Sequence, residues 1–99
     1  MKIIISESRL DSLIMNYLDE QFDGMTSSID EESWEWWGVG DDCLIEKQVK
    51  DGVVEVGVSH EIWEGLTDLF SLTPTQADEY ILEWLGKNLK IFPDELYIF

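Results

Sequence analysis

The side chains best suited to nucleophilic chemistry are Cys43 and His60, which stand at the outer ends of a predicted hairpin. In the register that the hairpin turn favours, they lie across from each other, and a thiolate beside an imidazole can act as a nucleophile. The many carboxylates nearby in sequence raise the pKa of such a thiol, and no glycine-rich element supplies donors for an oxyanion. A single cysteine is also a common small core residue. The sequence therefore predicts that the protein is not an enzyme and has no catalytic residue.

The patterns of histidine and carboxylate that bind metals are incomplete. His60 begins the zinc-binding pattern His-Glu-x-x-His, but Glu64 takes the place of the second histidine, and the chain contains one histidine. Asp41 and Asp42 follow a glycine-rich turn, yet apolar residues occupy the next positions, where a calcium loop needs oxygen ligands. The glycines are not followed by a nucleotide-binding motif. The sequence predicts no metal and no cofactor.

A short acidic segment rich in tryptophan is the strongest candidate for function. In an extended strand, Trp34 and Trp36 lie on one face, while Glu35 and Trp37 lie on the other. Aromatic anchors supply affinity at protein interfaces, and carboxylates supply steering and specificity. Packing of all three tryptophans into a small core is the competing interpretation, and the sequence leaves both open. The candidate partner-binding residues are Asp30, Glu31, Glu32, Trp34, Glu35, Trp36, Trp37, Asp41 and Asp42.

The net charge of the chain is −16, from 22 acidic and six basic residues. Residues 30–68 contain 12 acids and two lysines, whereas residues 1–29 and 69–99 each contain five acids and two basic residues. A negative field of this size repels nucleic-acid phosphates and anionic membranes. We therefore expect no direct binding to nucleic acid or membrane, and a partner that presents a basic protein surface.

Length and composition predict one globular domain over residues 1–99. The chain is 44% hydrophobic and 12% aromatic, which suffices for a single core and is too apolar for a disordered segment. The single cysteine forms no internal disulfide, the N-terminus lacks the pattern of a secretory signal, and the apolar runs are far shorter than a membrane span. These features predict a cytoplasmic protein.

Hydrophobic periodicity predicts two main helices. Over residues 7–23, apolar residues recur at helical spacing, and Gly24 is placed to end the helix. Over residues 74–88, a second apolar stripe follows Thr73 and Gln76, which form a capping-box pair around a proline at the first helical position. Each stripe is expected to pack on one face of a sheet.

Weaker signals predict the remaining elements. A β-branched run predicts a strand over residues 2–5, and residues 25–33 lack a clear period and are interpreted as a loop. Residues 60–71 are amphipathic and predict a third helix, with Ser59 as its N-cap. The apolar residues 96–99 are expected to be packed, either as a last strand of the same chain or against a second copy.

The best-specified element is a hairpin of residues 43–50 and 53–59, because the Asp51-Gly52 dipeptide suits a type I′ turn. With Lys50 opposite Val53, one face is largely apolar and the other is polar, and Lys47 is the exception that snorkels or meets an acid. The pairs on the apolar face are Val49 with Val54, Lys47 with Val56, Ile45 with Val58 and Cys43 with His60; those on the polar face are Gln48 with Glu55 and Glu46 with Gly57.

These elements predict an α+β fold. A small antiparallel sheet of three or four strands, including Trp34–Trp37 and the hairpin, is expected to carry the two main helices on one face. The strand order is left open.

The chain opens on a β-branched run followed by a helix start, Lys2-Ile3-Ile4-Ile5-Ser6-Glu7-Ser8-Arg9-Leu10. This opening resembles the start of small uncharacterised proteins encoded by phages and environmental bacteria. The resemblance covers about a tenth of the chain. It implies a phage-related or accessory-gene origin and carries over no functional residue.

Three functions follow as hypotheses. The first is a non-enzymatic interaction module that binds a basic partner surface through the acidic, tryptophan-containing segment of residues 30–42. The second is an assembly subunit that forms a homo-oligomer through the 96–99 tail or a sheet edge. The third is an anionic mimic of nucleic acid that inhibits a nucleic-acid-binding protein.

Overall fold

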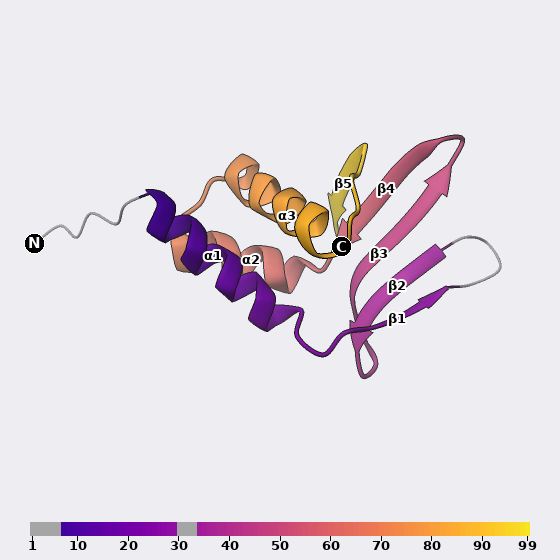
Figure 1. Cartoon of the computed structure of the whole chain (residues 1–99), viewed down its shortest axis with the longest axis horizontal. Coiled ribbons are helices and arrows are strands. Elements are labelled where there is room, and N and C mark those ends of the chain that lie inside the picture. Colours follow the sequence, from indigo (N-terminus) through magenta and orange to yellow (C-terminus); the bar gives the residue numbers. More distant parts are fainter. Residues whose placement is uncertain (1–6, 30–33) are drawn as a thin grey trace, which may run out of the picture.

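A computed structural model describes residues 7–29 and 34–99, and within these residues it contains three helices and one five-stranded sheet (Figure 1). The predicted strand over residues 2–5 lies outside the described residues. The elements in chain order are α1 (Glu7–Gln21), β1 (Thr26–Ile29), β2 (Trp34–Val39), β3 (Asp42–Lys50), β4 (Val53–Val58), α2 (His60–Phe70), α3 (Pro74–Asn88) and β5 (Glu95–Ile98).

The three predicted helices are confirmed within a few residues of their predicted ends. The capping box of α3 forms as predicted: the Gln76 backbone N–H donates to the Thr73 hydroxyl at 3.2 Å, and the Thr73 backbone N–H donates to the Gln76 side-chain oxygen at 3.0 Å. Ser59 is the N-cap residue of α2, as predicted, but its side chain makes no capping hydrogen bond. Its backbone N–H donates to the Leu44 carbonyl and so continues the pairing of β4 with β3.

The hairpin of β3 and β4 has the predicted register, from Lys50 opposite Val53 to Ile45 opposite Val58. Asp51 and Gly52 both have positive φ, at 52° and 79°, as a type I′ turn requires. Lys47 lies 3.6 Å from Glu35 of β2, so this lysine meets an acid.

The sheet is larger and differently connected than predicted. It has five strands in the order β1-β2-β3-β4-β5, with antiparallel pairs up to β4 and a parallel pair between β4 and β5. The expectation of three or four antiparallel strands is therefore wrong, since the sheet has a fifth strand and one parallel pair. The reason is that α2 and α3 return the chain to the edge of β4, where residues 96–98 pair with Val56–Val58 of the same chain.

The segment expected to be a loop, residues 25–33, contains β1. Its four residues, Thr26–Ile29, are all exposed, and their sequence lacks the apolar alternation that marks a half-buried strand. Backbone pairing with β2, from Thr26 opposite Gly38 to Ile29 opposite Glu35, is what makes this segment extended.

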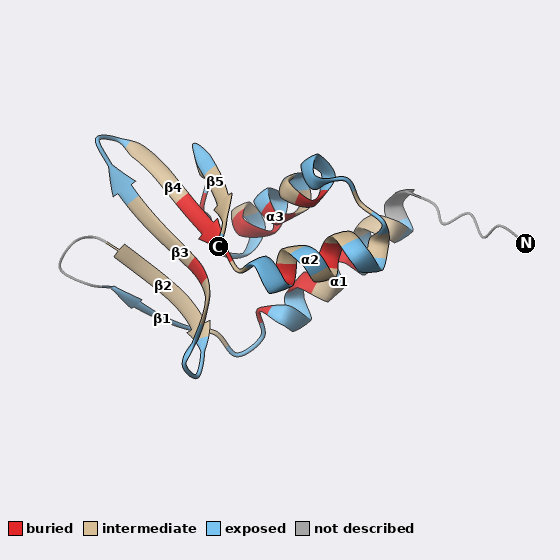
Figure 2. Cartoon of the chain, turned by 180° about the vertical axis from the view of Figure 1, so that it is seen from behind, coloured by how far each residue is buried: buried red, intermediate tan, exposed pale blue. Residues whose placement is uncertain are grey.

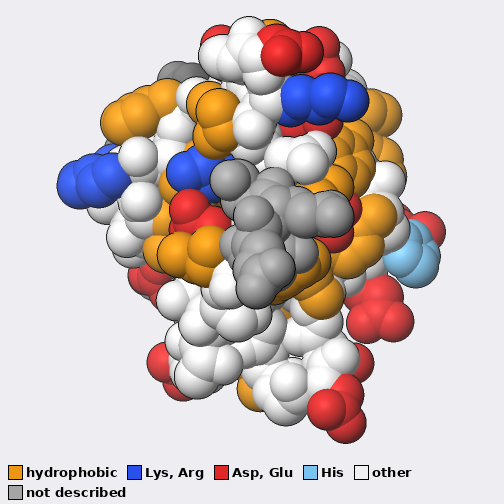
Figure 3. All heavy atoms as spheres, turned by 90° about the vertical axis from the view of Figure 1, so that its right-hand side faces the viewer, with side chains coloured by type: hydrophobic (Ala, Val, Ile, Leu, Met, Phe, Trp, Pro, Cys, Tyr) orange, Lys and Arg blue, Asp and Glu red, His pale blue; other side chains and the backbone are white. Residues whose placement is uncertain are grey.

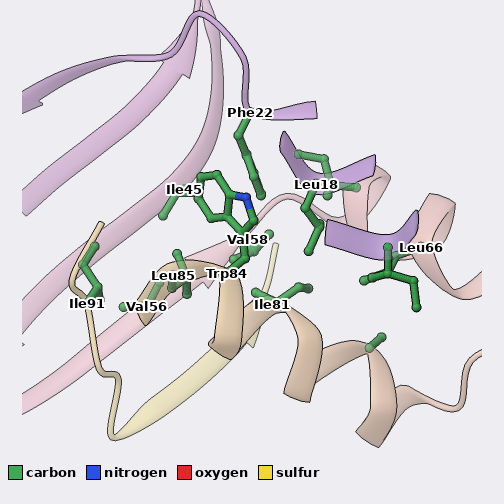
Figure 4. Close-up of a cluster of buried hydrophobic side chains, with 13 residues drawn as sticks. Leu18, Phe22, Ile45, Val56, Val58, Leu66, Ile81, Trp84, Leu85 and Ile91 are labelled. Atoms are coloured by element: carbon green, nitrogen blue, oxygen red, sulfur yellow. The ribbon is translucent and has the colours of Figure 1, made fainter. Parts of the chain in front are cut away.

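The core lies between the three helices and the nearer end of the sheet (Figures 2 and 4). Figure 4 shows the side chains of Ile45, Val56 and Val58 converging from the sheet on those of the helices. Alternation assigns these three residues to one face of the sheet, which is the face that the helices cover. The buried residues are Ile14, Leu18, Phe22, Ile45, Val56, Val58, Ile62, Leu66, Ala77, Ile81, Trp84, Leu85 and Ile91.

The sheet extends beyond the helices at its other end (Figures 1 and 2). Viewed from that end, exposed hydrophobic side chains lie among acidic and basic ones (Figure 3). Ile29 is 70% exposed and Val49 is 47% exposed. Among the described residues, the distal part of the sheet therefore lacks the packing that buries its proximal part.

Candidate functional site

The face of the sheet opposite the helices, called here the open face, carries the features that point to binding. The side chains that pack into or against the core come from the other face of the sheet, which is why this one is open. By the register of the strands, its residues are Thr26 and Ser28 of β1, Trp34, Trp36 and Gly38 of β2, Glu46, Gln48 and Lys50 of β3, Val53, Glu55 and Gly57 of β4, and Glu95 and Tyr97 of β5.

Trp34 and Trp36 form a stacked pair on the open face. Their ring centroids are 6.2 Å apart and their planes differ by 8°. Both residues are half-buried, and neither belongs to the hydrophobic core cluster. Cross-strand neighbours of the pair are polar, because Trp34 lies opposite Gln48 and Trp36 lies opposite Glu46. The two indoles therefore form an aromatic surface bordered by polar and acidic groups.

Tyr97 of β5 lies on the open face on the side of Glu46 away from Trp36. The Tyr97 hydroxyl donates to the Glu46 carboxylate, so the phenol ring crosses β4 above Gly57. A Cβ atom at Gly57 would overlap the Tyr97 ring, which explains why glycine stands there. Burial and the bond to Glu46 raise the pKa of Tyr97. Tyr97 thus stays a neutral donor at physiological pH and anchors the Glu46 carboxylate beside Trp36.

A cavity of about 160 Å³ opens beside Trp36, at the end of the open face next to β1. Thr26 and Ser28 of β1 line it together with Asp41 of the turn and Asp42, the first residue of β3. This volume is below the ~300 Å³ typical of small-molecule sites, and it suits a single side chain. The cavity thus brings together residues of β1, β2, β3 and the turn between β2 and β3.

A β-bulge shapes the wall of this cavity. The register of β2 and β3 shifts between Trp37 and Gly38, so that Leu44 is the extra residue on β3. A Cβ atom at Gly38 would overlap the backbone carbonyl oxygen of Asp42, so the close approach of the two strands requires glycine. The bulge turns Cys43 towards the cavity while Leu44 and Ile45 both reach the core.

Acidic residues outnumber basic ones on the open face. Glu55 of β4 lies directly opposite Glu95 of β5, a like-charge pair that destabilises a sheet. Among the described strands, Lys50 is the one basic residue that the register assigns to this face. The open face therefore has an excess of negative charge that the fold does not neutralise.

The predicted binding residues divide between the two faces of β2. Trp34 and Trp36 lie on the open face, whereas Trp37 packs against the core and Glu35 pairs with Lys47 on the helix side. The structure does not bring these four together. Asp41 and Asp42 join Trp36 at the cavity, and Asp30, Glu31 and Glu32 lie outside the described residues.

The predicted cross-strand pair of Cys43 and His60 does not form. The paired residues of β3 and β4 end at Ile45 and Val58, and His60 begins α2, where its ring nitrogen lies 3.5 Å from the Glu64 carboxylate. Cys43 instead pairs with Gly38 across the bulge, and its thiol donates to the Ile45 carbonyl at 3.5 Å. The expectation failed because the bulge and the start of α2 interrupt the alternation that it assumed.

Cys43 is expected to react slowly with alkylating reagents. Burial and the neighbouring Glu46 raise the pKa of its thiol, which lowers the thiolate fraction near neutral pH. With iodoacetamide at pH 7.5, the folded protein should be labelled more slowly than the same chain unfolded in urea at the same pH. Faster labelling of the folded protein would show an activated thiolate and contradict this expectation.

In the described residues, no group of three or more His, Cys, Asp or Glu side chains is arranged to hold a metal ion. Among the same residues, no helix combines the length and the apolar character needed to cross a membrane.

Several open-face residues escaped the sequence prediction. Ser28 and Thr26 were assigned to a loop, and Tyr97 to an apolar tail. Glu46 and Glu55 were correctly placed on the polar face of the hairpin, but the prediction did not connect that face to the tryptophans. The available signal was the short turn around Gly40, which makes β2 and β3 neighbours and so puts Trp36 beside Glu46.

The sequence matches no known family model and no curated protein, and no solved structure matches the chain.

Proposed function

We propose that the protein is a non-enzymatic interaction module that binds a basic partner surface through the open face of its sheet. The observation that carries the proposal is the stacked pair of Trp34 and Trp36 on the face that no described helix covers. Tryptophan is enriched at the energetic centres of protein interfaces, where it supplies a large contact area. Carboxylates beside the pair select a cationic partner.

The charge of the open face supports a basic partner. Glu55 and Glu95 are held side by side, and Asp41 and Asp42 are adjacent at the cavity. Repulsion within such pairs destabilises the free protein. A partner that brings lysine or arginine to this face relieves the repulsion, so association gains energy that the isolated fold lacks.

The test is a pull-down from the native host at a series of salt concentrations. We expect the wild-type protein to retain a basic partner at low salt and to lose it as salt rises, because screening weakens the electrostatic part of binding. The double variant Trp34→Ala/Trp36→Ala should retain that partner about tenfold less well or worse, as expected for truncated interface anchors. Leu69→Ala is the matched control, because Leu69 is 66% exposed on α2 and away from the sheet.

Two results would contradict the proposal. One is a partner whose retention does not change with salt. The other is equal loss of retention in the Leu69→Ala control and in the tryptophan variant, since this would separate binding from the open face.

Self-assembly is the second candidate function, and the exposed Ile29 and Val49 at the distal end of the sheet favour it. The tail of residues 96–99 is engaged within its own chain, where β5 pairs with β4. A homo-oligomer of this kind would use a sheet edge or the distal apolar residues, and not a tail donated to a second copy. Light scattering over a concentration series tests this candidate, and a strict monomer at high concentration would rule it out.

Mimicry of nucleic acid is a narrower form of the first function, and the net charge of −16 favours it. If the captured partner binds DNA or RNA, a competition titration should show nucleic acid displacing this protein from it. Simultaneous binding of both would exclude mimicry and leave the interaction module intact.

A further inference from the structure

Among the described residues, no strand pairs with the outer edge of β1. β1 is the terminal strand on its side of the sheet, and Figures 1 and 2 both show it as the outermost strand, away from the helices. Natural edge strands are blocked by charged residues, proline or bulges. β1 consists of Thr, Ser, Ser and Ile, and its pairing with β2 has no register shift. By contrast, the segment entering the opposite edge strand, β5, contains Pro93, Asp94 and Glu95.

Short side chains on β1 leave a path from this edge to Trp36. Ser28 lies directly opposite Trp36, and both line the cavity. A long side chain on a strand added outside β1 would pass over Ser28 and reach the indole. The same sheet contains this arrangement at its other edge, where Tyr97 passes over Gly57 to reach Glu46 on the second strand inward.

Arginine matches the walls of this cavity better than lysine does. Its planar guanidinium stacks on an indole face, and its fork of N–H donors pairs with carboxylate and hydroxyl oxygens, which Asp41 and Ser28 carry among the residues that line the cavity. Lysine has a single compact ammonium group that cannot stack and pair in the same plane. The cavity therefore favours one chemical type of basic residue.

We propose that β1 accepts an extended, arginine-containing segment of the partner as a sixth strand, with one arginine crossing Ser28 to stack on Trp36. This inference rests on the proposed function and defines the partner's chemistry. A strand added to an open edge gains main-chain hydrogen bonds, and its alternate side chains reach one face.

A second copy of this chain fits the edge less well than a basic segment does. Each copy carries a net charge of −16, so edge-to-edge pairing would bring two strongly negative bodies together. Arginine is also scarce in this chain, with Arg9 in α1 as its one example. Charge complementarity thus selects a basic partner over a second copy.

Calorimetric titration with synthetic peptides tests the inference. The probes are a short peptide that alternates threonine and arginine, its threonine and lysine counterpart, and two forms of the first with methyl groups on alternate backbone nitrogens. We expect tighter binding of the arginine peptide than of the lysine peptide. One methylated form should lose binding and the other should keep it, because only alternate N–H groups of an added strand face the edge.

Variants of the full-length protein locate the binding site. Trp36→Ala should weaken the arginine peptide about five- to tenfold and abolish the preference over lysine. Asp41→Asn/Asp42→Asn should weaken it about two- to fivefold. The control Glu61→Gln/Asp68→Asn removes the same charge from exposed positions on α2 and should weaken the peptide less. Ser28→Tyr blocks the path to Trp36 and should act like Trp36→Ala.

The possible failures are distinguishable. Equal affinity for the arginine and lysine peptides, or equal binding of both methylated forms, would overturn the strand and arginine inference while leaving a basic-surface module in place. Failure of both peptides to bind at low salt would overturn the inference and count against the proposed function as well. Concentration-dependent dimers that the Ser28→Tyr variant loses would assign the edge to a second copy instead.

Discussion

Trp84→Ala is expected to lower the free energy of unfolding by about 3–5 kcal/mol, the usual cost of truncating a buried tryptophan. Trp84 is 5% exposed, packs on Phe22 with ring centroids 4.4 Å apart, and donates its indole N–H to Asp19 at 2.8 Å. These contacts join α3 to α1 over the sheet. Since small domains have only about 5–15 kcal/mol of stability, we expect a partly unfolded protein at moderate temperature.

The matched comparison is Trp36→Ala, measured in the same urea titration. Trp36 is half-buried and outside the core cluster, so its loss should cost about 1 kcal/mol, mainly through the lost stack with Trp34. A cost for Trp36→Ala as large as that for Trp84→Ala would mean that the open-face tryptophans are structural, which would remove the main support for the proposed function.

Gly38→Ala is expected to destabilise the protein by about 1–3 kcal/mol and to abolish partner binding together. The added Cβ overlaps the Asp42 carbonyl oxygen, and backbone atoms cannot rotate away as a side chain can. Relief of the overlap requires β2 and β3 to separate at the bulge, which moves Asp41 and Asp42 away from Trp36. Urea unfolding gives the stability, and titration with the arginine peptide gives the binding.

Val39→Ala is the control for this substitution. Val39 is adjacent in β2 but 44% exposed, so its truncation should change stability by less than about 0.5 kcal/mol and leave peptide binding intact. If the Gly38→Ala variant has the stability and the peptide affinity of the wild-type protein, then β2 and β3 are not held as close together as the bulge requires.

Local sequence signals predicted those elements whose formation depends on nearby residues. The Asp51-Gly52 turn determines the register of its own hairpin, because the two positive φ values allow only one close pairing of the flanking strands. The capping box at Thr73 and Gln76 marks the start of α3, and this signal is also local, because its hydrogen bonds join residues three positions apart.

Features that depend on distant pairing were missed, although a last strand at residues 96–99 was one of the two expected alternatives. β1 has no apolar alternation, and only its backbone hydrogen bonds to β2 make it a strand. Parallel pairing of β5 with β4 depends on how α2 and α3 pack, which no local pattern specifies. The bulge beside Gly38 also depends on pairing between separate segments, because it forms only when β2 pairs with β3.

For the candidate site, alternation within Trp34–Trp37 was enough to separate Trp34 and Trp36 from Glu35 and Trp37, since successive side chains of any strand point to opposite faces. The acidity of the chain was likewise plain from composition. Tertiary structure alone decided which face the helices cover, and so which tryptophans remain outside the core. It also placed Ser28, Asp41 and Asp42 around Trp36, because they come from separate segments that meet only when the strands pair.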